Sequence, residues 1–246
     1  MVLKYIIANW KLNGSESLLN EFLNQFSSYN SDNYIVLCPP YLLLSGAEKF
    51  KAIDNFFIGS QNVSEFDNGP FTGEISAEIL ADYKIVHSIV GHSERRTLFA
   101  ESDEKINIKI KQLLNRKIIP ILCIGENLEQ RDTNTFKQII DLQLEKAFKN
   151  VKVDDQIIII AYEPIWSIGT GVIPEISQIN EVHDFIRTKI KHMYPKNVNQ
   201  FKIIYGGSVN LKNYHTILSS KAVDGVLVGG ASLNTKSFFE ICNFNN

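Results

Sequence analysis

Short apolar runs alternate with longer amphipathic stretches along the whole chain. The clearest run, residues 157–162, is rich in β-branched side chains and is typical of a strand that is buried on both faces. The stretch that follows, residues 176–193, has the apolar spacing of a helix that covers a core on one side. The same pattern predicts further strands at residues 5–8, 34–38, 56–60, 85–91, 118–124, 201–205 and 223–228. Further helices are expected at residues 15–26, 41–50, 76–82, about 106–114 and 136–148, with one behind each of the last two strands.

Eight strand–helix units predict a mostly parallel sheet with helices as its crossover connections. The periodicity does not decide whether the sheet stays open or closes into a (β/α)8 barrel. Residues 106–110 alternate apolar and polar side chains, as a strand would, and compete with the helix prediction there. In both architectures ligands bind at the carboxyl ends of the strands, so we expect the chemistry just past each strand.

Composition narrows the class of protein. The 246 residues contain no linker-like or low-complexity segment, so we expect one domain over residues 1–246. A net charge of −2 without a basic patch argues against nucleic acid or a membrane surface as partner, and no apolar run is long enough to span a bilayer. Three widely spaced cysteines, Cys38, Cys123 and Cys242, lack metal-ligand spacing and predict reduced thiols in a cytoplasmic protein.

Glu163 ends the run at residues 157–162 and begins a segment that resembles a mobile lid. Pro164 prevents further strand pairing, apolar residues follow, and Gly169-Thr170-Gly171 supplies permissive hinge positions. An apolar lid would remove water from the carboxylate and favour its use as a general base. From this segment alone, a solvated loop glutamate is an equal alternative.

Other strand ends carry polar residues that could complete such a site. Asn9 and Lys11 follow the first strand; the lysine could attract an anionic substrate or be a solvated loop cation. His92 begins a predicted helix whose backbone N–H groups disfavour the imidazolium, which would leave a neutral donor, although a single histidine is more often structural. Cys123-Ile124-Gly125-Glu126 after the fifth strand indicates support rather than chemistry.

Glycine pairs follow the last two strands. Gly206-Gly207-Ser208 and Gly229-Gly230, together with Gly169-Thr170-Gly171, would let backbone N–H groups converge on a phosphate. One such pair means little, but three glycine segments at neighbouring strand ends match the phosphate corner of a closed barrel.

Taken together, these segments resemble the triosephosphate isomerase family from end to end, in the family's order and spacing. The matching segments are Ala8-Asn9-Trp10-Lys11, Phe71-Thr72-Gly73-Glu74, Gly91-His92-Ser93-Glu94-Arg95-Arg96, Cys123-Ile124-Gly125-Glu126, Tyr162-Glu163-Pro164-Ile165-Trp166, Tyr205-Gly206-Gly207-Ser208 and Val228-Gly229-Gly230-Ala231. The resemblance implies a closed (β/α)8 barrel that interconverts dihydroxyacetone phosphate and glyceraldehyde 3-phosphate without cofactor or metal.

The resemblance also implies roles for particular residues. Glu163 would be the base and His92 a neutral donor to the substrate carbonyl. Lys11 and Asn9 would stabilise negative charge, and Glu94 would be a supporting carboxylate with an open part in proton transfer. Main-chain N–H groups of Gly169, Ser208, Gly229 and Gly230 would hold the phosphate.

The loop at residues 61–74 predicts an oligomer, which the resemblance makes a homodimer; the alternative is a loop that folds onto its own barrel. It has turn residues, yet it carries Phe66 and Phe71 near its tip, where a solvated loop would not place them. In the family this loop, with Thr72 and Glu74, docks into a second subunit beside Asn9 and Lys11, with Glu74 close to the partner's Arg95.

One departure from the family lies at the far hinge of the lid, where this chain has Val172-Ile173-Pro174. In the family a tyrosine hydroxyl, matched here by Tyr205, accepts a hydrogen bond from the main-chain N–H at the position of Pro174 when the lid is shut. Proline has no N–H, so we expect this bond to be missing here.

Two rival functions remain open at this stage. One is a phosphosugar aldolase-type barrel that uses Lys11 as a Schiff base, although no neighbour evident in the sequence would activate that lysine. The other is a non-catalytic phosphate-binding barrel, which the joint presence of Glu163, His92 and Lys11 disfavours.

Overall fold

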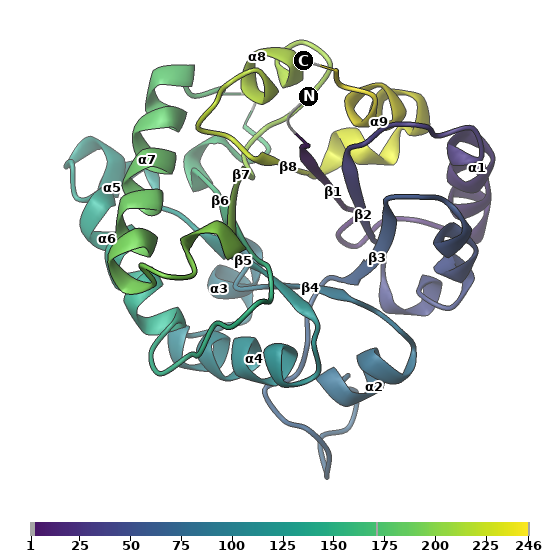
Figure 1. Ribbon diagram of the computed structural model, residues 1–246, viewed down its shortest axis with the longest axis horizontal. Helices are drawn as coiled ribbons and strands as arrows, with labels where there is room; N and C mark the ends of the chain where they lie inside the picture. Colours follow the sequence, from purple (N-terminus) through teal and green to yellow (C-terminus); the bar gives the residue numbers. More distant parts are fainter. Residues whose placement is uncertain (1–2, 171, 246) are drawn as a thin grey trace.

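The computed structural model describes residues 3–170 and 172–245. Its eight strands all pair in parallel with their neighbours in sequence order, and β1 pairs with β8, which closes the barrel. Figure 1 shows the strands as a closed ring with the helices outside it. The expected (β/α)8 barrel is therefore confirmed, and the closure that periodicity left open is decided by the β1–β8 pairing, in which Ala8 lies opposite Val228.

The strands agree with the predicted runs to within two residues at each end. They are β1 (Tyr5–Asn9), β2 (Tyr34–Cys38), β3 (Phe56–Ser60), β4 (His87–Val90), β5 (Ile119–Ile124), β6 (Ile158–Tyr162), β7 (Phe201–Tyr205) and β8 (Gly225–Val228). All residues of β6 are buried, as its continuous apolar run predicts.

The α-helices form the outer layer. They are α1 (Glu16–Phe26), α2 (Ala77–Asp82), α3 (Ser93–Leu98), α4 (Asp103–Asn115), α5 (Leu128–Asp132), α6 (Phe136–Ala147), α7 (Ile176–Met193), α8 (Tyr214–Leu218) and α9 (Thr235–Cys242). Ser15, Ser76 and Ser102 cap α1, α2 and α4 by accepting a backbone N–H, which fixes where each helix begins.

The predicted helices need one correction and one addition. Residues 41–50 do not form an α-helix but two 3-10 helices, η1 (Tyr41–Leu43) and η2 (Gly46–Ala52). The short helix α5 was not predicted, because five residues are too few to show an apolar stripe. Residues 106–110 are helical despite their alternation, since Ile106 and Ile110 together pack into the core.

Alternation along the strands creates two cores. Side chains from alternate positions, such as Ile7, Val36, Ile159 and Leu227, form a compact cluster that fills the barrel interior. The intervening side chains join the apolar faces of the helices in a larger cluster. The filled interior makes the barrel a rigid support and leaves the carboxyl ends of the strands as the place for a site.

Candidate active site

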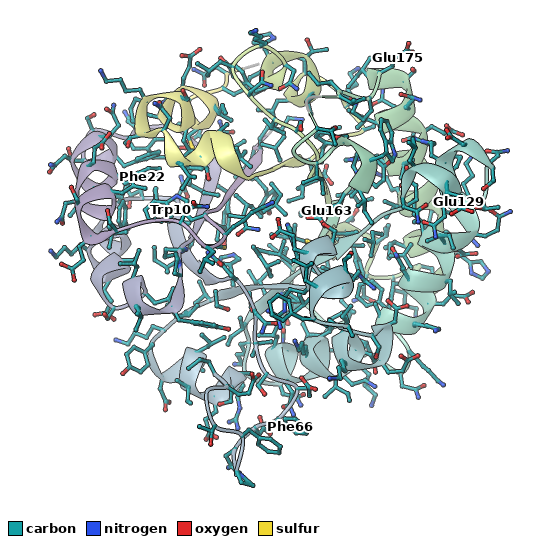
Figure 2. The ribbon with its side chains drawn as sticks, turned by 180° about the vertical axis from the view of Figure 1, so that it is seen from behind. Trp10, Phe22, Phe66, Glu129, Glu163 and Glu175 are labelled. Carbon is teal, nitrogen blue, oxygen red and sulfur yellow. The ribbon has the colours of Figure 1, made fainter. Side chains whose placement is uncertain are left out.

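A cavity of ≈ 290 Å³ opens at the carboxyl ends of the strands. Every predicted site residue except Glu94 lines it: Asn9, Lys11, His92, Glu163, Gly169, Ser208, Gly229 and Gly230. Glu94 reaches the site through an ion pair with Lys11. Strand ends that are far apart in sequence are thus brought around one hollow, and Glu163 lies near the middle of the molecule in Figure 2.

Glu163 is almost fully buried, with 1% of its surface exposed. Its Oε2 accepts a hydrogen bond from the backbone N–H of Ser93 at 3.0 Å, which fixes one oxygen of the carboxylate. Its Oε1 lies 3.2 Å from Nε2 of His92, and among the described residues no donor is well aligned with that oxygen. One carboxylate oxygen therefore remains available to take a proton.

The hydrogen bonds of His92 assign its tautomer. The backbone N–H of Glu94, in the first turn of α3, donates to Nδ1 of His92 at 3.2 Å. Since Nδ1 accepts this bond, a neutral ring carries its hydrogen on Nε2, the nitrogen that faces Glu163 and the cavity. This tautomer presents an N–H donor to the cavity, as the predicted role of His92 requires.

Lys11 has a backbone φ of +54°, which is costly for a residue with a side chain. Hydrogen bonds on both sides maintain this conformation: its N–H donates to Oδ1 of Asn9 at 3.0 Å, and its carbonyl accepts from Nε2 of Gln61 at 2.9 Å. The side-chain Nζ lies 2.6 Å from Oε1 of Glu94. The strained backbone directs a cation to the cavity. Gln61 is a supporting residue that no motif in the sequence indicated.

Backbone groups of three glycine-containing segments also line the cavity. Gly169 has φ +72°, a conformation that glycine adopts without strain, and Gly229 and Gly230 lie where β8 ends. Ser208 donates its hydroxyl to the carbonyl of Ser167 at 2.7 Å, which ties the end of β7 to the lid segment. Gly171, which the lid hypothesis also included, lies outside the described residues.

Glu126 connects the site to the lid. Its carboxylate is fully buried, and its Oε1 accepts bonds from the hydroxyl of Tyr162 and from Nε1 of Trp166, each at 3.0 Å. Burial raises the pKa of Glu126, an effect that the Trp166 hydrogen bond and the nearby Arg131 guanidinium oppose. The residue that the sequence marked as support therefore binds the segment around Trp166, for which the sequence predicts a lid.

Within residues 3–170 and 172–245, no group of three His, Cys, Asp or Glu side chains is placed to hold a metal ion. Across the same residues, no helix has the length and apolar composition needed to cross a bilayer.

Comparison with known proteins agrees with this geometry. The family model described as triosephosphate isomerase matches residues 4–245. A triosephosphate isomerase of Francisella philomiragia is 38% identical over 246 residues, 99% of this chain and 97% of its own, and one of Alkaliphilus metalliredigens is 40% identical over 243 residues, 97% and 98%. The crystal structure of triosephosphate isomerase from Bartonella henselae superposes with a TM-score of 0.88 at 34% identity and covers 98% of both chains. The chain therefore belongs to the triosephosphate isomerase family.

Proposed function

We propose that Glu163 and His92 carry out the proton transfers of a triosephosphate isomerase reaction in the cavity described above. The activity itself, interconversion of dihydroxyacetone phosphate and glyceraldehyde 3-phosphate, follows from membership of the family. The observation that carries the residue assignment is the 3.2 Å approach of His92 Nε2 to the unengaged oxygen of Glu163, on one wall of that cavity.

The chemistry requires a base and a donor on adjacent atoms of the substrate. Glu163 removes a proton from the carbon beside the carbonyl, while His92 donates a hydrogen bond to the carbonyl oxygen as negative charge develops there. The resulting enediolate takes the proton back from Glu163 on the neighbouring carbon. His92, whose Nε2 faces the cavity, gives its proton to the former carbonyl oxygen and takes the hydroxyl proton from the neighbouring oxygen, which becomes the new carbonyl. With this second transfer, bonds and charges balance without any further reactant.

Lys11 supplies the positive charge that an anionic substrate and an enediolate need. Its Nζ is paired with Glu94, which holds the ammonium in place, and Asn9 supports the Lys11 backbone. Main-chain N–H groups of Gly169, Ser208, Gly229 and Gly230 then hold the phosphate. Closure of the lid over this arrangement excludes water, which protects the enediolate from loss of phosphate.

The site disfavours the two rival functions. A Schiff-base lysine needs an apolar pocket or a cationic neighbour, whereas Lys11 has a carboxylate 2.6 Å away. A phosphate-binding module has no need for a buried carboxylate oriented by Ser93 and His92.

We also propose that residues 1–246 act as one cytoplasmic catalytic domain that pairs as a homodimer. Support comes from the loop between β3 and α2, which extends away from the barrel in Figure 1. Phe66 and Phe71 stack at 3.7 Å near its tip, where Phe66 remains 42% exposed. Through Phe71, Thr72, Gly73 and Glu74 this loop would reach the partner's active site.

The decisive test is Glu163→Gln, which keeps the shape of the side chain and removes the base. General acid–base catalysis contributes roughly 10²–10⁴-fold, so we expect kcat to fall by at least the lower figure while KM changes far less. Glu129→Gln is the matched control, because Glu129 is exposed on α5, away from Glu163 in Figure 2. A Glu163→Gln enzyme with nearly native kcat in a coupled isomerase assay would show that the assignment is wrong.

A further inference from the structure

The side-chain amide of Gln143 binds one peptide segment at two points. Gln143 lies on α6, on the outside of the barrel, and is partly buried. Its Oε1 accepts the N–H of Gly125 at 2.9 Å, and its Nε2 donates to the carbonyl of Gly125 at 3.1 Å. Both backbone hydrogen-bonding groups of Gly125 are thus bound by one residue, which does not line the cavity.

Gly125 in turn supports the backbone of Glu163. Only glycine fits at this position, because a Cβ at residue 125 would lie 1.8 Å from the carbonyl oxygen of Glu163. On either side, the N–H of Glu163 donates to Ile124 at 2.7 Å and the N–H of Ile165 donates to Glu126 at 3.0 Å. The segments after β5 and β6 therefore continue the ladder that pairs Ile124 with Tyr162.

We infer that Gln143 is a positioning residue for the base Glu163, acting through Gly125. Gln143 holds the Gly125 peptide in place. Because Gly125 packs closely against the backbone of Glu163, the backbone that carries the carboxylate is held in place as well. An error of about 1 Å in the place of a catalytic group can cost roughly 100-fold in rate, so a fixed support behind the base has a direct effect on kcat. This inference rests on the proposed role of Glu163.

The amide is specifically suited to this position. It presents a donor and an acceptor side by side, the same pair that a neighbouring strand would offer to a peptide group. In Gln143→Glu one carboxylate oxygen can still accept from the N–H of Gly125. The other oxygen faces the carbonyl oxygen of Gly125, and the two repel each other. A thioether of similar length forms neither bond and leaves two backbone groups without their partner.

The experiment compares Gln143→Met and Gln143→Glu with Gln138→Met. Gln138 lies on the same helix and is exposed, so Gln138→Met makes the same change of side chain without removing the two hydrogen bonds to Gly125. For Gln143→Met we expect kcat to fall about tenfold and KM to change by less than about twofold, because Ser208, Gly229 and Gly230 of the proposed phosphate site follow β7 and β8 rather than β5 or β6. Gln143→Glu should lose at least as much, and Gln138→Met should match the native enzyme.

Two inhibitors separate positioning from general loosening of the structure. A phosphorylated hydroxamate, which mimics the planar enediolate, should bind Gln143→Met about tenfold more weakly, whereas the inhibition constant of inorganic phosphate should stay within about twofold. If Gln143→Met does not fold, the same measurements on Gln143→Glu decide the matter.

A kcat within twofold of native in the folded variants, or equal losses of affinity for both inhibitors, would overturn the inference. Glu163→Gln distinguishes this failure from a failure of the proposed function. If Glu163→Gln is inactive while the Gln143 variants are fully active, only the positioning role is wrong. A fully active Glu163→Gln would overturn the function of the base itself.

Discussion

At the scale of single residues, neutral imidazoles are buried in two places outside the site. His87, at the start of β4, is fully buried with its Nε2 3.0 Å from the hydroxyl of Tyr34, and burial lowers its pKa to about 3. His183 on α7 is also fully buried, with its Nδ1 3.2 Å from the carbonyl of Ala222, and burial lowers its pKa to about 4. In an unfolded chain both rings have a pKa of about 6.5.

These shifts predict acid sensitivity of the fold. Below pH 6.5 the unfolded chain binds protons that the folded chain does not, so the free energy of unfolding falls as the pH falls towards about 4. Each histidine should contribute about 1 kcal/mol of this loss between pH 6 and pH 5. Urea unfolding of His87→Phe, whose ring is flanked by Phe57 and Tyr34, should therefore show a shallower decline than the native chain over that interval. An equal decline in both proteins would show that His87 titrates normally in the fold.

At the scale of elements, the lid meets the end of β7 through hydroxyl groups. The hydroxyl of Tyr205 lies 3.4 Å from Oγ of Ser167, and burial raises the pKa of Tyr205 to about 12, so it remains a protonated donor. At the far hinge Pro174 is buried and offers no N–H. The hydrogen bond that the resemblance implies between this tyrosine and the main chain at position 174 therefore cannot form. Ser167 provides the Tyr205 hydroxyl with a different partner.

We therefore expect Tyr205→Phe to lower kcat/KM by less than about threefold. A typical hydrogen bond contributes about 1 kcal/mol, and the bond between Tyr205 and Ser167 is long, at 3.4 Å, and therefore weaker. Pro174→Ala restores an N–H at the hinge and should create an energetic coupling with Tyr205 that the native chain lacks. A double-mutant cycle on kcat/KM measures that coupling. A loss of more than tenfold in Tyr205→Phe with no new coupling would mean that another donor, with Ile173 the first candidate, has replaced the missing one.

At the scale of the whole molecule, apolar side chains remain uncovered around the mouth of the barrel and the loop between β3 and α2. Leu12 is 96% exposed and Leu42 94% exposed, and Phe99 and Tyr83 are also exposed. Leu42 and Tyr83 line one hollow beside α2, and Phe99 lines another together with Phe66 of the loop. Exposed apolar side chains grouped in this way are typical of a surface that a partner covers. They agree with the proposed homodimer.

Thr72→Arg tests that dimer, because a charge at the tip of the loop would have to be buried in the partner subunit. We expect light scattering at micromolar concentration to show a dimer for the native chain and a monomer of low activity for Thr72→Arg. Leu128→Arg, an exposed site on α5, should leave mass and activity unchanged. A native chain that is monomeric and fully active would contradict the proposal.

The strand–helix order and most element bounds could be predicted from the amino-acid sequence alone. This was possible because apolar periodicity is a local property: the buried run that became β6 and the stripe that became α7 are visible without any partner. The motifs at strand ends likewise identified the residues that line the cavity, since the carboxyl ends of parallel strands meet at one edge.

Features that depend on contacts between distant segments could not be predicted in this way. The β1–β8 pairing closes the barrel, Ser93 holds the carboxylate of Glu163, and Gln143 reaches across from α6 to Gly125. None of these has a periodic signal, because one hydrogen bond between residues far apart in sequence leaves no local pattern. Residues that line the cavity could therefore be predicted from their place after a strand, whereas the residues that contact them from behind became visible only in the folded chain.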